Sequence, residues 1–183
     1  MILRIAINVA VAIAAVLAFV VLLAATKPST FRVQRSVMID AAPDKIFPLI
    51  DDFHNWPGWA PQDKEDPSMK RIYSGPAFGT GAVSDWNSTG NAGRGRMSII
   101  ESAPPNTVLV KVDFVKPFTA HNLNEFILEP ILEPRPATKV TWTMQGSNLY
   151  VMLMSTFVNM DRVLGKHFET GLHNLKQAAE NRP

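Results

Sequence analysis

The most constraining feature of this 183-residue chain is a run of short segments in which apolar and polar residues alternate. Such alternation is typical of β-strands that bury one face. Clusters of glycine, proline and asparagine separate the segments, and these tight connections favour an antiparallel meander over βαβ units. The six predicted strands are Lys70–Ser74, Ala82–Asn87, Arg94–Glu101, Val108–Val115, Asn122–Leu128 and Lys139–Gln145.

One further strand and a short helical region precede this run. Four apolar residues share a face at period two, which predicts a strand over residues 31–39. Residues 40–44 then predict a helix start, with Pro43 in the first helical position. Pro48 should keep this helix short or kinked, and the aromatic stretch 54–59 predicts a tight turn or a single helical turn.

The last segment of the chain changes period. From Phe157 to Ala179 apolar residues recur every three or four positions, with charged residues on the other faces, which predicts a long amphipathic helix. The expected fold is therefore α+β: a curved antiparallel sheet wrapped around a long C-terminal helix. Gly165 should mark the closest approach of helix and sheet, because it has no Cβ.

The alternation also predicts which side of each strand faces the helix. A slip of one residue would exchange the two sides, so the assignment can be tested residue by residue. The residues expected to face the helix are Met97, Ile99, Val110, Val112, Phe114, Phe126, Leu128, Val140 and Trp142. Those expected outside are Arg96, Lys111, Asp113, Glu125 and Thr141.

The N-terminal 26 residues have a different character. From Ile5 to Ala25 the chain is apolar except for Asn8, and a helix of this length spans roughly the 30 Å hydrocarbon core. We predict one transmembrane anchor over residues 1–26, followed by a folded domain over residues 27–183. The alternative is a cleaved signal peptide, against which the long apolar run and the poor cleavage site argue. The flanking charges do not fix the side of the membrane.

Charge and composition exclude several classes of function. The net charge is +2 and no run of lysine or arginine appears, which argues against a nucleic-acid partner. Without cysteine there are no disulfides, thiolate metal sites or cysteine nucleophiles. His167 and His173 would point about 120° apart on a helix, so they cannot hold one metal ion together. No known catalytic signature is present, and we expect neither metal nor cofactor.

Several local strings, in this order along the chain, resemble a known family. They lie at residues 39–43, 52–59, 73–76, 93–97, 117–118, 140–144 and 165–169. Over residues 31–181 the chain resembles the START-like, or helix-grip (SRPBCC), superfamily, and within it the polyketide cyclase/dehydrase-like branch. Pro48 departs from the smoother first helix that the family leads us to expect. The resemblance implies the fold but no single activity, because members bind or transport lipids or cyclise polyketides.

We expect a pocket where the sheet and the helix diverge. Its predicted lining is Trp56, Trp59, Trp86, Phe114, Met154 and Phe157. Asn122 and Asn124 share the inner face of their strand with apolar residues, and an amide in an apolar interior needs a hydrogen-bond partner. A bound ligand or water is one reading of these two amides; solvent or backbone at the strand end is the other.

The leading hypothesis is a membrane-anchored binding protein for a small hydrophobic molecule, either lipid-like or aromatic. The alternative is a polyketide cyclase or dehydratase type of enzyme, in which Asn122, Asn124 and Trp86 orient a substrate in the same pocket. A third possibility is a structural or partner-binding domain whose own side chains fill the pocket. The patterns determine neither the ligand nor the oligomeric state.

Overall fold

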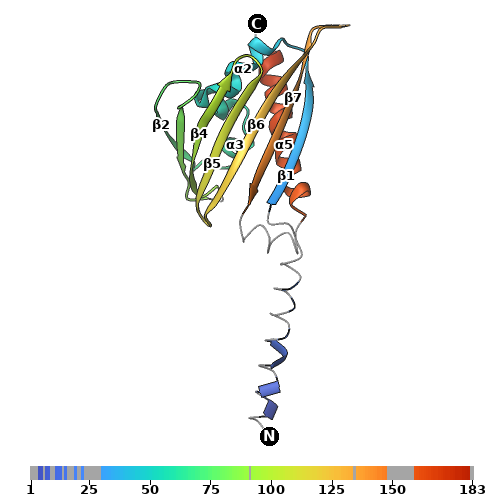
Figure 1. Cartoon of the computed structure of the whole chain (residues 1–183). Coiled ribbons are helices and arrows are strands. Elements are labelled where there is room, and N and C mark those ends of the chain that lie inside the picture. Colours follow the sequence, from blue (N-terminus) through green and yellow to red (C-terminus); the bar gives the residue numbers. More distant parts are fainter. Residues whose placement is uncertain are drawn as a thin grey trace.

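The computed structural model describes residues 30–90, 92–133, 135–147 and 159–181, and in the N-terminal stretch residues 4, 5, 7, 8, 11–13, 15, 19 and 22. The described chain forms a seven-stranded sheet with helices on one face (Figure 1). In chain order the elements are β1 (Thr30–Ile39), α2 (Pro43–Asp51), the 3-10 helix η1 (Phe53–Gly58), α3 (Pro61–Glu65), β2 (Lys70–Ser74), β3 (Val83–Asn87), β4 (Arg94–Ala103), β5 (Thr107–Lys116), β6 (Ala120–Ile131), β7 (Ala137–Ser147) and α5 (Met160–Glu180).

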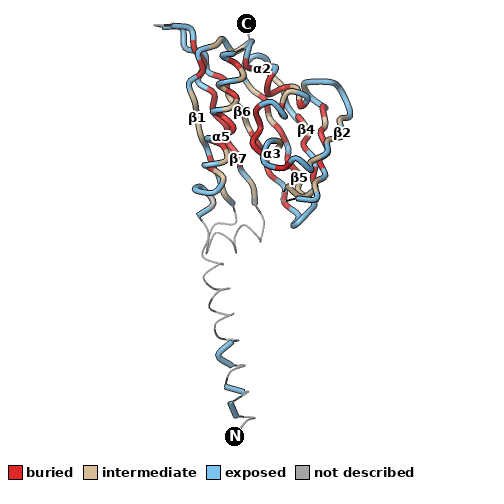
Figure 2. Tube along the Cα trace, turned by 180° about the vertical axis from the view of Figure 1, so that it is seen from behind, coloured by how far each residue is buried: buried red, intermediate tan, exposed pale blue. Residues whose placement is uncertain are grey.

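The strands lie in the order β1-β7-β6-β5-β4-β3-β2, and all neighbouring pairs are antiparallel. Strands β2 to β7 form the predicted meander, and β1 pairs with β7, so the first strand lies beside the last. Seen from behind, helix α5 runs along β1 and β7, while α2 and α3 lie beside it on the same face (Figure 2). The predicted α+β helix-grip architecture is confirmed.

The predicted strand faces are confirmed, with two differences in burial. Eight of the nine residues expected to face the helix are at most 4% exposed. The ninth, Phe114, is only half-buried, because it lies near the end of β5 at the wall of a cavity. Thr141 lies on the outer side, as predicted, but it is buried. Ser36 lies opposite it on β1, and the two hydroxyl oxygens are 2.9 Å apart.

The region between β1 and β2 supplies the helices that lie beside α5. Helix α2 is short, as Pro48 predicts, and the Pro48 carbonyl accepts a hydrogen bond from Asn55 Nδ2 at 2.9 Å. The side chain of Asp52 caps η1 by accepting from the backbone N–H of His54. Helix α3, which begins at Pro61, was not predicted from the sequence.

Helix α5 is held against β1 by an arginine that faces inward. Arg35 lies two residues after the buried Val33 on β1, so both side chains point to the inner face of the sheet. Its guanidinium donates to the carboxylates of Asp161 at 2.9 Å and Glu169 at 2.8 Å. A side chain at Gly165 would overlap this guanidinium. Gly165 therefore marks a close approach, as predicted, but the space is filled by the Arg35 side chain and not by the sheet backbone.

Aromatic side chains form the centre of the core. The ring of Trp142 stacks on Phe168 with 4.2 Å between centroids and on Phe126 with 5.0 Å. Trp59 meets both Phe126 and Trp142 edge-on, and Trp56 packs against Trp59 at 4.9 Å. The indole N–H groups of Trp56 and Trp59 donate to backbone carbonyls of α2. This cluster joins α5 and the η1 region to the sheet.

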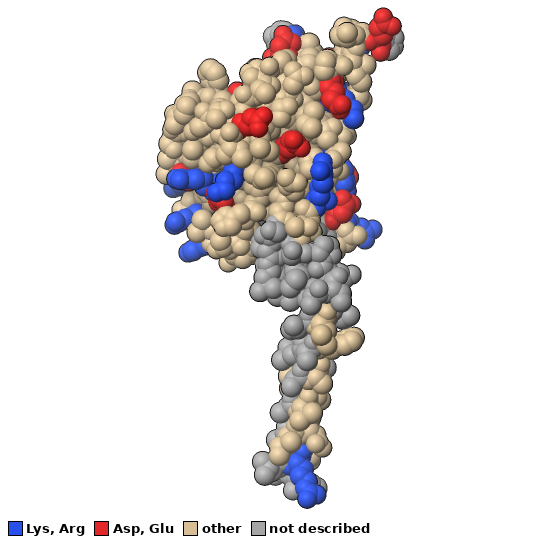
Figure 3. Space-filling model, in the orientation of Figure 1, with Lys and Arg blue, Asp and Glu red and all other residues tan. Residues whose placement is uncertain are grey.

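The outer side of the sheet carries scattered charged side chains among uncharged ones. Basic and acidic side chains are interspersed over the face seen in Figure 3. Two pairs bridge neighbouring strands, Arg96 with Asp85 and Lys139 with Glu129. Such exposed pairs contribute little to stability, so the core and the inner face carry most of it.

Most of the predicted anchor over residues 1–26 lies outside the described residues. The residues of that stretch that are described are helical and exposed. Within the described part of the chain, no helix combines the length and apolar character needed to cross a membrane.

Candidate ligand-binding pocket

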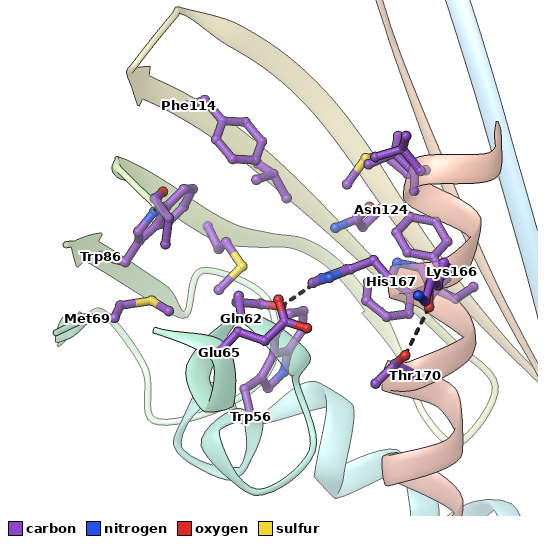
Figure 4. A pocket seen from close by; sticks show the side chains of 18 of the residues that line it. Trp56, Gln62, Glu65, Met69, Trp86, Phe114, Asn124, Lys166, His167 and Thr170 are labelled. Carbon is purple, nitrogen blue, oxygen red and sulfur yellow. Dashed lines mark hydrogen bonds between the residues drawn. The ribbon is translucent and has the colours of Figure 1, made fainter. Parts of the chain in front are cut away.

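A cavity of about 480 Å³ lies between helices α3 and α5 and the inner face of the sheet (Figure 4). The described side chains leave this volume unfilled, and it falls within the roughly 300–1,000 Å³ usual for small-molecule sites. Val163 on α5 is 55% exposed and lies at the cavity's edge. The lining residues are Trp56, Gln62, Glu65, Met69, Arg71, Trp86, Ala92, Met97, Val112, Phe114, Asn124, Trp142, Met144, Val163, Leu164, Lys166, His167, Phe168 and Thr170.

Trp86 and Phe114 form the apolar wall opposite α5 (Figure 4). Their rings meet edge to face, with 5.3 Å between centroids. The indole lies over Gly95 on the neighbouring strand, where a methyl group would overlap it. Its N–H donates to the Ala92 carbonyl at 3.0 Å, so the ring is fixed at its polar end as well. A rigid aromatic wall of this kind can bury a large apolar area of a ligand.

A buried carboxylate holds the loop next to this wall. Asp66 accepts hydrogen bonds from the hydroxyls of Ser68 at 2.6 Å and Ser88 at 2.5 Å, and from the backbone N–H of Ala92 at 3.1 Å. These hydrogen bonds lower the pKa of Asp66 to about 2. Because Ala92 also accepts from Trp86, the Asp66 cluster fixes the edge of the pocket.

An ion pair is buried at the α3 side of the pocket. Arg71 on β2 donates to both carboxylate oxygens of Asp63, at 2.6 and 2.7 Å. Its third contact is the Ser84 hydroxyl at 2.9 Å. The Arg71 and Asp63 side chains are only 6% and 10% exposed. The pair joins α3 to the far strands of the sheet, and its charges neutralise each other.

His167 of α5 and Gln62 of α3 face each other across the cavity (Figure 4). His167 Nε2 lies 3.1 Å from Gln62 Oε1. Because an amide oxygen only accepts, Nε2 carries the hydrogen and Nδ1 is left as an acceptor. Burial lowers the pKa of His167, and the opposing effect of the Glu65 carboxylate is smaller. The imidazole is therefore neutral at pH 7, since its ordinary pKa is already about 6.5.

The two predicted asparagines are separated by the structure. Asn124 lines the pocket and is 3% exposed, and its Oδ1 is buried with no hydrogen-bond partner among the described residues. Asn122 lies two residues before Asn124 on β6 and lines a second hollow together with Phe31 and Gly146. Its Oδ1 sits over Gly146, where a Cβ would overlap it. The two amides therefore do not act on one bound molecule.

The structure brings together part of the predicted lining. Trp56, Trp86, Phe114 and Asn124 all line the cavity. Trp59 does not, because it is fully buried behind Trp56 and supports the wall from the core. Met154 and Phe157 lie outside the described residues. The part these residues play in binding stays a prediction.

Sequence reasoning missed the polar half of the pocket. Gln62 and Glu65 belong to α3, which was not predicted. His167 was considered only as a metal ligand and not as a pocket residue, although it lies three residues after Leu164 and so shares its helix face. Arg71 was missed because we did not expect a charged side chain on the inner face of a strand. Among the residues that the structure describes, no group of three or more histidine, aspartate or glutamate side chains is placed to hold a metal ion.

The sequence of the chain matches a known protein family, and its fold is similar to solved structures. The profile of the family described as "Polyketide cyclase / dehydrase and lipid transport" matches residues 30–180. No curated protein sequence matches the chain.

Three solved structures share the fold. A protein from Nitrosospira multiformis is 17% identical, with a TM-score of 0.59, and the match covers 82% of this chain and 97% of that one. A protein from Chromobacterium violaceum is 12% identical, with a TM-score of 0.58 and coverages of 85% and 100%. Truncated norcoclaurine synthase from Thalictrum flavum is 11% identical, with a TM-score of 0.58 and coverages of 84% and 96%.

Proposed function

The chain belongs to the polyketide cyclase/dehydrase and lipid transport family, and we propose that its domain binds a small hydrophobic molecule in the pocket between α3, α5 and the sheet. The observation that carries the proposal is the unfilled volume of about 480 Å³ beside a fixed aromatic wall. Trp86 is held by Gly95, Phe114 and Ala92 at once, so the wall keeps its shape without a ligand. A preformed pocket lined mainly by apolar side chains, with polar groups on one side, is typical of a ligand-binding site.

The proposal includes membrane attachment through residues 1–26. Its support is the apolar run from Ile5 to Ala25, which is long enough to cross a bilayer as one helix. The full chain should then stay in the membrane pellet after a carbonate wash. A mature N-terminus near residue 26, read by mass spectrometry, would instead identify a cleaved signal peptide. Attachment would keep the pocket close to a source of hydrophobic ligands.

The pocket is tested with a neutral fluorescent probe, N-phenyl-1-naphthylamine, and a pair of matched variants. Leu164 is a half-buried residue of α5 that lines the cavity. Leu164→Trp replaces its isobutyl group with a larger indole ring in the cavity. Ile100 is 44% exposed on β4 and lines no part of this cavity, so Ile100→Trp is the control. We expect the full chain and Ile100→Trp to bind the probe equally, and Leu164→Trp to bind it at least tenfold more weakly. Equal binding by all three proteins would contradict the proposal.

A cyclase or dehydratase type of activity is the second candidate. The observation in its favour is that a neutral histidine, His167, and an unpartnered amide, Asn124, line one cavity. A neutral imidazole with a free Nδ1 can accept a proton from a bound substrate. The small molecule that co-purifies with the full chain distinguishes the two functions. A binding protein returns it unchanged after incubation, whereas an enzyme converts it, and His167→Gln should then stop the conversion.

A further inference from the structure

The side chain of Asn124 is an unsatisfied polar group at the pocket. It is 3% exposed, and its Oδ1 is buried without a hydrogen-bond partner in the described part of the chain. Leaving a buried polar group unpaired costs about 1–3 kcal/mol. Native proteins rarely retain such a group, so each one calls for an explanation.

The neighbours of Asn124 on the sheet cannot supply the missing partner. Its cross-strand partners are Val110 on β5 and Met144 on β7, which offer no strong donor. Apolar Val112 and Met144 lie beside it at the cavity wall. Since no described residue donates to Asn124 Oδ1, a molecule bound in the cavity is the natural donor.

A second unpartnered group lies on the same wall. Trp142 is diagonal to Asn124 across β6 and β7, and its Nε1 is a buried donor with no partner among the described residues. The atom of this indole closest to Gly171 is Cζ3, at 2.8 Å from where a Cβ would stand. Nε1 is on the opposite edge of the ring, away from Gly171, and Trp142 is one of the residues that line the pocket. Asn124 Oδ1 is thus an acceptor and Trp142 Nε1 a donor without a partner among the described residues, and the two residues lie on the adjacent strands β6 and β7.

The inner part of the pocket offers no counter-charge to a ligand. Arg71 is already neutralised by both oxygens of Asp63. Glu65 and Lys166 are exposed and carry opposite signs. His167 is neutral, because burial lowers its pKa. A carboxylate, phosphate or ammonium group seated at Asn124 would lose its hydration without gaining an ion pair.

We infer that the ligand is an uncharged apolar molecule with a hydroxyl group, and that this hydroxyl donates a hydrogen bond to Asn124 Oδ1 while its oxygen can accept from Trp142 Nε1. A hydroxyl matches both orphan groups because it is a donor and an acceptor at once. The apolar body then lies against Trp86 and Phe114. The inference rests on the proposed function and narrows it to a chemical class of ligand.

Three probes of one size separate the possibilities: 1-naphthol, naphthalene and 1-naphthoate. Their binding to the full chain in lipid nanodiscs is read from quenching of tryptophan fluorescence, with the partition into empty nanodiscs subtracted. One or two net hydrogen bonds correspond to a preference of roughly tenfold for 1-naphthol over naphthalene. The charged 1-naphthoate should bind more weakly than either.

Asn124→Leu removes the orphan acceptor while keeping the side chain close in size. This variant should lose most of the preference for 1-naphthol over naphthalene, because only Trp142 Nε1 is left to pair with the hydroxyl. Its melting temperature without ligand should rise, because an unpaired amide oxygen is removed. Asn122→Leu is the matched control, since Asn122 lies on the same strand but in the other hollow. It should keep the tenfold preference. Asn124→Val repeats the test with a smaller side chain if leucine disturbs folding.

The outcomes separate this inference from the function on which it rests. Binding of naphthalene without any preference for 1-naphthol would overturn the inference and leave the pocket as a general hydrophobic site. A preference that survives undiminished in Asn124→Leu would overturn it too, because Asn124 would then not hold the hydroxyl. Failure of all three probes to bind would overturn the proposed function itself.

Discussion

The buried pair of Arg71 and Asp63 gives a quantitative test of how the pocket wall is held. Asp63→Asn removes the negative charge and leaves a guanidinium that is 6% exposed without its counter-ion. Removing one partner of a buried pair typically costs about 3–5 kcal/mol. At about 2–4 °C per kcal/mol for a domain of this size, the melting temperature should fall by roughly 6–20 °C. Thermal unfolding of the full chain, followed by tryptophan fluorescence, measures this shift.

The pair of Arg96 and Asp85 is a matched control on the outer side of the sheet. It has the same chemistry and similar geometry, with two hydrogen bonds of 2.7 and 2.9 Å, but its side chains are 55% and 35% exposed. Water screens such a pair, and its usual contribution is about 0–1 kcal/mol. Asp85→Asn should therefore lower the melting temperature by no more than about 4 °C.

The double variant Asp63→Leu with Arg71→Met checks the physical cause. It removes both charges and fills the space with apolar groups, so it should regain most of the stability lost in Asp63→Asn. If Asp63→Asn and Asp85→Asn shift the melting temperature equally, burial does not govern the cost and the reasoning is refuted.

Three further predictions follow from single contacts. Gly95→Ala should lower the free energy of unfolding by about 1–3 kcal/mol and weaken probe binding, because its methyl group displaces the Trp86 indole. Gly58 has open space around it, so Gly58→Ala should change neither quantity in the same melting and fluorescence assays. Gly165→Ala should destabilise the domain by a similar amount, since the guanidinium of Arg35 must leave its place under α5; hydrogen exchange of α5 amides should then accelerate. The hydrogen bonds that lower the pKa of Asp66 to about 2 stabilise the fold above its ordinary pKa near 3.8, and this stability is lost as the pH falls toward 2. Acid titration of the melting temperature should show the loss in the native chain, and Asp66→Asn should lack that step and already be less stable at pH 7.

The strand pattern was readable from the sequence because each strand has one buried face. Period-two alternation assigned Val110, Val112 and Phe126 inward and Lys111 outward, and the structure agrees. Arg35 and Arg71 were not read as inward residues, because pattern reasoning treats a charge as a solvent marker. Each is tolerated because a carboxylate on another element pairs with it. The partners of Arg35 lie 126 and 134 positions away on α5, and the partner of Arg71 lies eight positions away on helix α3, which was not predicted.

The candidate site was predicted less completely than the fold for a related reason. Alternation shows that Asn122 and Asn124 point inward, but it does not show which part of the inner face remains open. That depends on where α5 and α3 lie over the sheet, and α3 was not predicted. The same holds for Trp56, which lines the cavity, and Trp59, which is fully buried in the core behind it.

The sequence by itself determined the order of the elements, the inner and outer faces of the strands and the amphipathic C-terminal helix, because these depend on periodicities within a few residues. Only the tertiary structure decided that α5 is pinned along β1 by Arg35, and that His167 and Asn124 line one cavity. These choices depend on contacts between residues more than forty positions apart, and the free energy of such contacts has no signature in a local window of sequence.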